Sequence, residues 1–592
     1  MNKFKSNIRL FIYTIRLLCK INKKTFIFSL ILSLINGGFP IATLLLSQRI
    51  INEIQLLKKP FNNLLQLIII YFAISGIGTI LQNINGYTLN KLNNILQYGI
   101  NKIIIEKCSK LSLETLERTE TYDTIARLEQ DIATKPYQTL QAIMSIFSNV
   151  VSAILASIIL ISWNVWIEVI LLVISLSMFA GEIIIGDKEF IIKYKRSDKE
   201  RESWYYSYLL THDTAFKEIK SFGLKNHFIN KYIELSNIFI TQSNQIEKFK
   251  TALNISIALI QDVFSLVTMI LAIHAAYIGS IMIGTAMSFL NAINMVQGST
   301  NALASGIYTI YNSNLYIRLL EEFLNNLEGE EVVNETKIKI ERISSLELSG
   351  VGYDYPEFDD VLRNVTLKLN IGEQIAIVGK NGSGKSTLFK IICGLYKSTR
   401  GCFFVNGQDI NEYDVESYRK RTSVLFQDFL KFEGSLEENI VIGDITKQAN
   451  PDEIYVALNK ANVNFLKSNG YYDLNKTLGN WFDNGSQLSG GQWQKIALAR
   501  AYYRKADVIL LDEPSSALDA MAEMKIFKSF FDISKDKIGI YITHRVKIAK
   551  NATKIVVLEG GEIVGVGSHD KLMKDCSIYR EMYHEELKDI NG

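Results

Sequence analysis

Apolar and polar residues follow two different patterns in the two halves of this chain. In the first half, long stretches carry few or no charged residues, whereas in the second half charged residues occur at ordinary density. A membrane-spanning helix needs about 20 predominantly apolar residues. The pattern predicts an α-helical, six-span membrane domain over 25–317, with a tight turn at Glu168. The expected spans are 25–48, 61–90, 136–167, 169–186 and two parts of 263–317 divided at Gly279 and Gly284.

Two long connections between the predicted spans are rich in Lys and Arg. They cover 91–135 and 187–250, and their heptad-like apolar spacing suggests that the helices continue beyond the membrane. Basic connections stay on the cytoplasmic side. Residues 1–24 carry seven basic and no acidic residues, which favours a cytoplasmic basic lead-in at the lipid bilayer. We therefore expect a multi-pass protein of the cytoplasmic membrane, with both termini and a second domain in the cytoplasm.

After a polar linker over 318–336, short apolar strands alternate with helical segments. This change predicts an α/β domain over 337–592. The net charge of +3 gives no indication of a nucleic-acid partner, and the five cysteines lack metal-ligand spacing.

Isolated polar residues inside the predicted spans suggest a substrate site. Such residues are uncommon within membranes and often functional. The alternative is structural, because they can also cap a helix, face a neighbouring helix or lie at the lipid headgroups. The four residues are Asn36, Glu182, Asp262 and His274.

The strongest motif is GKNGSGKST at 379–387, which fits the phosphate-loop pattern between a predicted strand and a helix. Its glycines allow backbone N–H groups to surround an anion at a helix N-terminus. Lys385 is expected to reach the terminal phosphates, and Ser386 to bind Mg²⁺. The predicted ATP contacts in this loop are Gly379, Lys380, Asn381, Gly382, Ser383, Gly384, Lys385, Ser386 and Thr387.

The rest of a phosphoryl-transfer site follows in order along the chain. A strand over 508–511 leads to Asp512, a candidate to hold Mg²⁺ through water, and to Glu513, a candidate to polarise the attacking water. Gln427 can contact the metal and the γ-phosphate, and His544 can contact the γ-phosphate. A lone histidine after a strand is more often structural, but the order of these residues supports a catalytic set of Glu513, His544 and Gln427. The expected metal contacts are Ser386, Gln427 and Asp512.

The segment LSGGQ, at Leu488, Ser489, Gly490, Gly491 and Gln492, resembles the signature of ATP-binding cassette (ABC) transporters. That resemblance covers essentially the whole chain. It implies that Tyr355 stacks on adenine, and that the signature contacts ATP held by the other subunit of a homodimer. It also implies ATP and Mg²⁺ as cofactors, and coupling helices near 117–124 and 211–222 that rest on the ATPase domains. The matching D-loop is Ser516, Ala517, Leu518 and Asp519.

Several strings resemble exporters of lanthionine-containing peptides, the lantibiotic exporters. They lie at 202–213, 423–429, 479–482, 487–499 and 567–572. The segment TLGNWFDNG at 477–485 departs from the common drug- and lipid-exporter pattern. The resemblance implies ATP-driven export, by alternating access, of a ribosomally made and modified peptide with its leader attached.

The same resemblance implies peptide-modifying enzymes as further partners. Bacteriocin exporters that trim their own cargo carry a cysteine peptidase before the first span, and we expect this protein to have none and another enzyme to remove the leader. Three alternatives remain open. They are a multidrug or lipid exporter, an immunity pump that expels the mature peptide, and a non-transporting ATPase, which the six spans disfavour.

Overall fold

The computed structural model describes residues 2–56, 60–131, 134–326, 337–355, 358–514 and 520–591. The chain divides into two compact units. Unit 1 comprises Met1–Ser109 and Thr119–Glu328, and unit 2 comprises Lys110–Arg118 and Gly329–Gly592.

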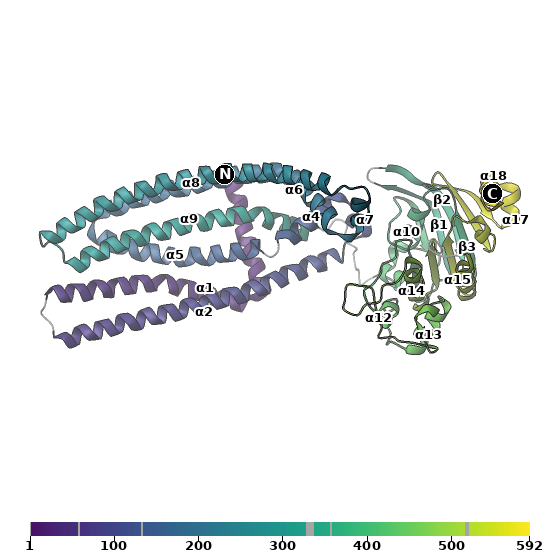
Figure 1. The fold of residues 1–592 in the computed structure, drawn as a ribbon, viewed down its shortest axis with the longest axis horizontal. Helices are drawn as coiled ribbons and strands as arrows, with labels where there is room; N and C mark the ends of the chain where they lie inside the picture. The colour runs from purple at the N-terminus through teal and green to yellow at the C-terminus, as the bar shows by residue number, and fades with distance from the viewer. Residues whose placement is uncertain are drawn as a thin grey trace. The chain divides into compact units, whose positions relative to one another are not determined.

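Unit 1 is built from long helices. Within this unit, α1 packs along α2, α6 packs along α8, and α9 packs most extensively against α5 (Figure 1). At about 1.5 Å per residue, the 53-residue α8 is roughly 80 Å long, far more than the ~30 Å of a hydrocarbon core. The predicted helical extensions beyond the spans are therefore present. The helices are α1 (Asn2–Leu56), α2 (Phe61–Cys108), α4 (Thr119–Asp131), α5 (Lys135–Trp163), α6 (Val165–Thr211), α7 (Asp213–Ser221), α8 (Lys225–Tyr277) and α9 (Ile283–Asn325).

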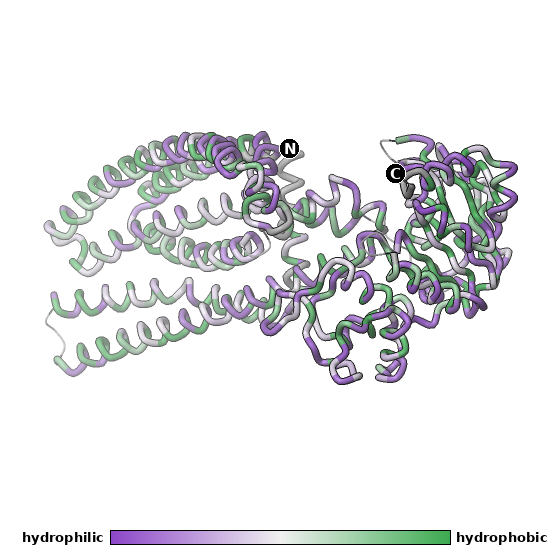
Figure 2. Tube along the Cα trace, turned by 45° about the vertical axis from the view of Figure 1, so that its right-hand side comes forward, coloured by the Kyte–Doolittle hydropathy of each residue, from purple (hydrophilic) through white to green (hydrophobic). Residues whose placement is uncertain are grey.

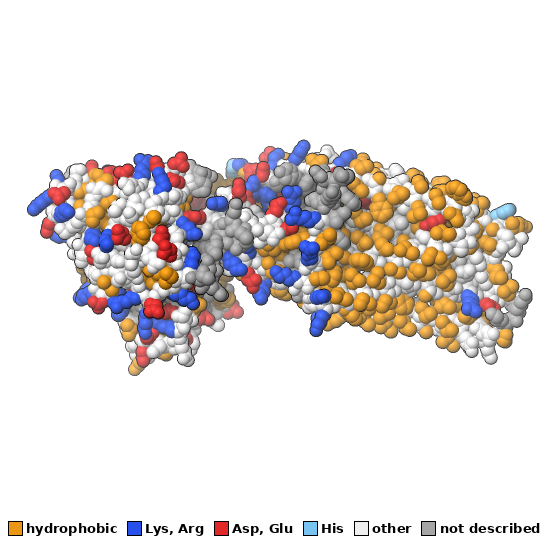
Figure 3. Space-filling view, turned by 180° about the vertical axis from the view of Figure 1, so that it is seen from behind, with side chains coloured by type: hydrophobic (Ala, Val, Ile, Leu, Met, Phe, Trp, Pro, Cys, Tyr) orange, Lys and Arg blue, Asp and Glu red, His pale blue; other side chains and the backbone are white. Residues whose placement is uncertain are grey.

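The surface of unit 1 changes character along these helices. Figure 2 shows hydrophobic segments along the long helices. On the face in Figure 3, apolar side chains cover these helices, and charged side chains gather toward the end that carries α4 and α7. Five described segments are long and apolar enough to cross a membrane. They are Asn22–Leu56, Phe61–Cys108, Lys135–Trp163, Val165–Glu189 and Lys225–Tyr277.

The sixth predicted span lies in α9, which is not among these five segments. This helix carries Asn, Gln, Ser and Thr side chains over 291–301. It packs against α1, α5, α6 and α8. A helix surrounded by other helices needs less apolar surface than one that faces lipid, which explains its weaker hydropathy.

The predicted turn at Glu168 is wrong. The break falls at Asn164, whose backbone is extended and whose Oδ1 accepts a hydrogen bond from Trp166 N at 2.9 Å. This side-chain cap starts α6 at Val165. Glu168 therefore lies in the first turn of α6 and is buried.

Unit 2 contains a six-stranded sheet in the order β14-β13-β3-β12-β11-β6 and a four-stranded sheet in the order β2-β1-β4-β5. Five strands of the larger sheet are parallel, and β14 pairs with β13 antiparallel at one edge. The main strands are β1 (Ser345–Tyr355), β2 (Phe358–Asn370), β3 (Gln374–Val378), β4 (Arg400–Val405), β5 (Gln408–Asp409), β6 (Thr422–Leu425), β11 (Val508–Asp512), β12 (Ile538–Ile542), β13 (Lys554–Glu559) and β14 (Glu562–Gly567). Two short pairs are formed by β7 (Gly434–Ser435) with β10 (Thr477–Leu478), and by β8 (Lys467–Ser468) with β9 (Tyr471–Tyr472).

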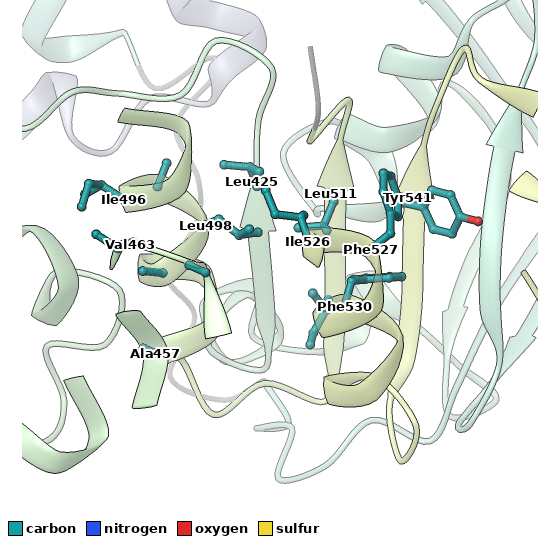
Figure 4. Close-up of a cluster of buried hydrophobic side chains, with 14 of the residues drawn as sticks. Leu425, Ala457, Val463, Ile496, Leu498, Leu511, Ile526, Phe527, Phe530 and Tyr541 are labelled. Carbon is teal, nitrogen blue, oxygen red and sulfur yellow. The ribbon is translucent and has the colours of Figure 1, made fainter. Parts of the chain in front are cut away.

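Helices cover the larger sheet, whose inner strands are buried on both faces. On β11, Ile509 and Leu511 belong to one apolar core, whereas Val508 and Leu510 belong to the other. Figure 4 shows the first core, in which α14 and α15 side chains lie against the strands. The helices are α3 (Leu113–Leu116), α10 (Lys385–Ile392), α11 (Val415–Lys420), α12 (Leu436–Val441), α13 (Pro451–Lys460), α14 (Gly490–Tyr503), α15 (Ala520–Ile533), α16 (Val546–Ala549), α17 (His569–Asp575) and α18 (Ser577–Asn591).

Parallel strands end at the same edge of their sheet. The loops after β3, β6, β11 and β12 carry, respectively, the phosphate-loop motif, Gln427, Glu513 and His544. This topology brings four separate sequence motifs to one edge.

Candidate ATP-binding and hydrolysis site

The phosphate loop connects β3 to α10 with backbone conformations that favour glycine. Gly382 and Gly384 have positive φ values of +78° and +96°. A Cβ on Gly379 would lie 2.2 Å from the carbonyl oxygen of Leu558, so only glycine fits there. Backbone conformation and close packing therefore explain why glycine occupies these positions.

Polar groups in this loop are arranged to receive an anion. The Lys385 Nζ donates to the carbonyl oxygens of Gly379 and Lys380, each at 2.9 Å. Burial lowers the pKa of Lys385, while Glu513 and Asp512 oppose that shift. The Ser383 Oγ is buried and has no hydrogen-bond partner among the described residues. An orphaned hydroxyl beside a lysine at a helix N-terminus fits the phosphates of ATP.

Three predicted catalytic residues come together at the end of β11. Gln427 Nε2 donates to Glu513 Oε2 at 3.0 Å, and His544 Nε2 lies 2.5 Å from Glu513 Oε1. The Glu513 backbone has a φ of +44°, and its N–H donates to Ile542 O at 3.2 Å. Burial, reinforced by Glu513, raises the pKa of neighbouring Asp512 to about 6. The two oxygens of Glu513 are therefore held by side chains from two different loops.

Sequence reasoning missed Gln494, which also contacts this centre. Its side chain is 1% exposed, and its Nε2 donates to the backbone carbonyl of Glu513 at 3.3 Å. Gln494 lies on α14, two residues after Gln492 of the signature. Its position two residues after a recognised motif was the available signal.

The predicted adenine contact, Tyr355, lies at the end of β1. Its hydroxyl is 3.3 Å from Thr387 Oγ1 of the phosphate loop. Its ring contacts Tyr353 edge-on at 5.0 Å and Tyr396 edge-on at 5.9 Å, and those two rings stack at 4.9 Å. Tyr355 is therefore one member of a three-tyrosine cluster that sequence reasoning did not identify.

Segment 110–118 is part of unit 2 and contacts this tyrosine cluster. Glu117 Oε1 accepts from Lys390 Nζ of α10 at 2.9 Å, and Tyr396 OH donates to the other Glu117 oxygen. Glu114 Oε1 accepts from Tyr353 OH at 3.2 Å. Burial raises the pKa of Tyr353 and of Tyr396, and the neighbouring carboxylates add to both shifts. We name residues 110–118 the docked loop.

The docked loop corrects the position of the first predicted coupling helix. That helix was expected near 117–124, but α3 begins at Leu113 because the Ser112 side chain caps it. Within the predicted range, Glu117 makes the contacts with Lys390 and Tyr396. The residues from Thr119 to Asp131 form α4, which belongs to unit 1. The second predicted turn, 211–222, contains α7 and belongs to unit 1.

The signature residues form the start of α14. Ser489 Oγ accepts from Gln492 N at 3.3 Å, and Gln492 Oε1 accepts from Ser489 N at 2.9 Å. This capping box fixes the helix N-terminus. A Cβ on Gly490 would meet no atom within 4 Å, so the N-terminus is open on that side. The predicted D-loop, Ser516, Ala517, Leu518 and Asp519, lies outside the described residues.

The unusual segment 477–485 holds two aromatic side chains toward solvent. Glu433 accepts from Asn480 N at 2.8 Å and from Trp481 N at 3.3 Å. Trp481 is 83% exposed and Phe482 is 59% exposed. Glu433, which sequence reasoning did not identify, therefore orders the exposed aromatic segment.

Comparisons with known proteins agree with this geometry. The family model described as ABC transporter matches residues 362–516. The subtilin transport ATP-binding protein of Bacillus subtilis is 40% identical over 574 residues, which cover 97% of this chain and 93% of that protein. The nisin transport ATP-binding protein of Lactococcus lactis subsp. lactis is 37% identical over 583 residues, which cover 98% and 96%.

Among solved structures, a bacterial Atm1-family ABC exporter with ATP bound has a TM-score of 0.79 and 20% identity. The match covers 95% of this chain and 98% of that one, which shows the same fold. The chain is a multi-pass membrane protein that binds ATP and couples its hydrolysis to transport. It belongs to the ABC transporter family, in the group that includes the subtilin and nisin transport ATP-binding proteins.

Proposed function

We propose that this protein exports a lantibiotic-type precursor peptide, with its leader attached, across the cytoplasmic membrane. The observation that carries the proposal is the similarity to the subtilin and nisin transport proteins, which extends over nearly the whole chain. The exposed Trp481 and Phe482 segment, which resembles lantibiotic exporters rather than drug exporters, supports the same choice.

In the proposed mechanism, ATP lies on the phosphate loop with its base against Tyr355. Lys385 binds the terminal phosphates, and the Ser383 hydroxyl donates to the same group. Mg²⁺, held by Ser386, Gln427 and Asp512, would neutralise phosphate charge. The exposed hydroxyl of Ser386 and the buried carboxylate of Asp512 fit that role.

Glu513 is the proposed catalytic carboxylate. Gln427 and His544 hold its two oxygens, which orients the group for hydrogen bonding to the attacking water. His544 is also proposed to donate a hydrogen bond to the γ-phosphate. A buried Gln494 fixes the backbone carbonyl of the same residue.

A second copy of the chain completes each site. We propose that its signature residues, 488–492, contact the γ-phosphate through the N-terminus of α14, where backbone N–H groups favour an anion. Closure of the two ATPase domains is transmitted through the docked loop to the membrane domain over 25–317, and the peptide cavity opens outward. Peptide-modifying enzymes are proposed to deliver the cargo on the cytoplasmic side.

The ATPase activity of the purified protein in lipid vesicles tests this proposal. We expect stimulation by leader-bearing subtilin or nisin precursor, or by the precursor encoded beside the gene for this protein. The isolated leader, the mature peptide and common drugs should not stimulate. Stimulation by drugs or lipids alone would favour a multidrug or lipid exporter, and stimulation by mature peptide alone would favour an immunity pump.

A further inference from the structure

The four polar residues in the predicted spans have different surroundings. Asp262 and His274 are exposed on α8, and Asn36 is half-buried in α1. Glu182 of α6 is only 7% exposed. A buried ionisable residue in a membrane segment is costly and often functional. Glu182 is therefore the member of this set that requires an explanation.

Glu182 is buried without full compensation. Its Oε2 atom has no hydrogen-bond partner among the described residues. Lys250 of α8 and Tyr308 of α9 lie within the electrostatic influence of its carboxylate. The Lys250 Nζ lies 4.9 Å from the centre of the Tyr308 ring. The Glu182 carboxylate thus lies near a pair in which the Lys250 ammonium group sits over the Tyr308 ring.

Further polar contacts join α6 to α9 close to Glu182 in sequence. Tyr311 OH donates to Asp187 Oδ1 at 2.5 Å. Tyr308 OH donates to Glu189, and Asn312 Nδ2 donates to Glu189 Oε2 at 3.2 Å. Every carboxylate in this group lies on α6, and every donor lies on α9. The side chains of α9 approach closely because a Cβ on Gly186 of α6 would lie only 3.1 Å from Tyr311 Cδ1.

We propose that this junction of α6, α8 and α9 binds a lysine side chain of the peptide cargo. Carboxylates and tyrosine faces are the groups that bind ammonium and guanidinium ions most favourably. Glu182 supplies a carboxylate oxygen that has no hydrogen-bond partner among the described residues, and the Tyr308 face accepts the incoming cation in competition with Lys250. This inference rests on the proposed peptide export and names the cargo chemistry that the membrane unit recognises.

A test uses subtilin precursor in three forms: unmodified, with lysine amines acetylated, and with lysine amines dimethylated. Acetylation removes the charge, whereas dimethylation keeps it and adds similar bulk. The full-length protein in lipid vesicles is assayed for the peptide concentration that gives half-maximal ATPase stimulation. Glu182→Gln should raise that concentration at least about tenfold for the unmodified and dimethylated peptides, but less than about twofold for the acetylated peptide.

Glu168→Gln is the matched control, because Glu168 is also a buried carboxylate of α6, with both oxygens unpartnered among the described residues. It lies 14 positions before Glu182 in sequence, roughly 21 Å along the helix. Its neighbours Ile167 and Leu171 belong to an apolar core. Glu168→Gln should leave the half-maximal concentration unchanged.

Lys250→Gln should act in the opposite direction and lower the half-maximal concentration, because it removes the competing ammonium. If these residues had only a structural role, both Glu182→Gln and Lys250→Gln would raise the half-maximal concentration, which would overturn the site. Equal effects of Glu182→Gln on acetylated and unmodified peptide would also overturn it. If Glu182→Gln does not fold, the sign of Lys250→Gln decides. No stimulation of the wild-type protein by any precursor would instead contradict the proposed function itself, and the site with it.

Discussion

Glu513 adopts a backbone conformation that is uncommon for a residue with a side chain. Its φ of +44° lies in the left-handed region, and strain of this kind is often found at functional sites. Here the conformation is supported by hydrogen bonds to the Glu513 N–H, carbonyl and both carboxylate oxygens. Because its backbone and both carboxylate oxygens are all hydrogen-bonded, Glu513 is expected to keep one orientation of its carboxylate.

Glu513→Gln should retain ATP binding and lose at least about 100-fold in kcat, because the amide cannot act as a base toward water. Binding of a fluorescent ATP analogue and steady-state ATPase activity check the two parts separately. Glu373→Gln is a control at the opposite end of β3, where Glu373 pairs with Lys554 at 2.6 Å. Near-normal hydrolysis by Glu513→Gln would remove Glu513 from the catalytic set.

Gly479 is a second residue whose position depends on the absence of a side chain. Its φ is +95°, and an added Cβ would lie 1.5 Å from Glu433 Oε2. Gly479→Ala should lower the free energy of unfolding by about 2 kcal/mol or more, roughly 5 °C in Tm. Gly470→Ala is the matched control, because Gly470 has a φ of +88° but open space around it. Equal losses of Tm in Gly479→Ala and Gly470→Ala would show that the expected clash with Glu433 does not lower the stability.

At the scale of elements, the docked loop contacts residues beside both the proposed adenine contact and the phosphate loop. Glu114 contacts Tyr353, and Glu117 contacts both Tyr396 and Lys390 of α10. Because Tyr355 contacts both tyrosines, a change at the adenine can reach the docked loop through one layer of side chains. If ATP binds as proposed, this arrangement links the docked loop directly to nucleotide occupancy.

Glu117→Gln should weaken this link, since it removes the charge that Lys390 and Tyr396 contact. We expect the precursor-stimulated part of the ATPase activity to fall at least about fivefold, while the basal rate changes less than about twofold. Glu120→Gln, an exposed carboxylate in α4, serves as the control. If stimulation survives in Glu117→Gln, the docked loop does not transmit the signal.

The sequence predicted most of the elements and much of the site, for identifiable reasons. Glycine-dependent turns and the ends of parallel strands have local signatures, so the phosphate loop, Gln427, Glu513 and His544 could be found. The contacts of Glu114, Glu433 and Gln494 were missed, because the groups that they contact lie far away in the sequence. The turn at Asn164 was missed because the prediction placed the turn at the nearest charged residue, Glu168, and not at the uncharged residue that caps the helix.

At the scale of the whole molecule, the account depends on two copies of the chain. The signature helix N-terminus is capped within its own subunit yet open at Gly490, as expected for a surface that meets a ligand from outside. Each proposed ATP site then uses the phosphate loop of one copy and the signature of the other. Defects in the two motifs should therefore complement each other.

Mixed dimers test this arrangement. Lys385→Ala and Ser489→Arg homodimers should each be nearly inactive, because both of their sites lack one necessary part. In a mixed dimer, one site carries both defects and the other carries none. Co-purified mixed dimers, isolated with two different tags, should recover about a quarter to a half of the wild-type ATPase rate. Mixed dimers as inactive as both parents would contradict composite sites.

The central claim, export of a leader-bearing peptide, is tested most directly by transport into inside-out vesicles that contain the purified protein. With ATP, the wild-type protein should accumulate full-length subtilin precursor in a form protected from external protease, and Glu513→Gln should not. The leader should remain attached, since cleavage is assigned to another enzyme. Accumulation of a drug or lipid without the precursor, or removal of the leader by the transporter alone, would contradict the account.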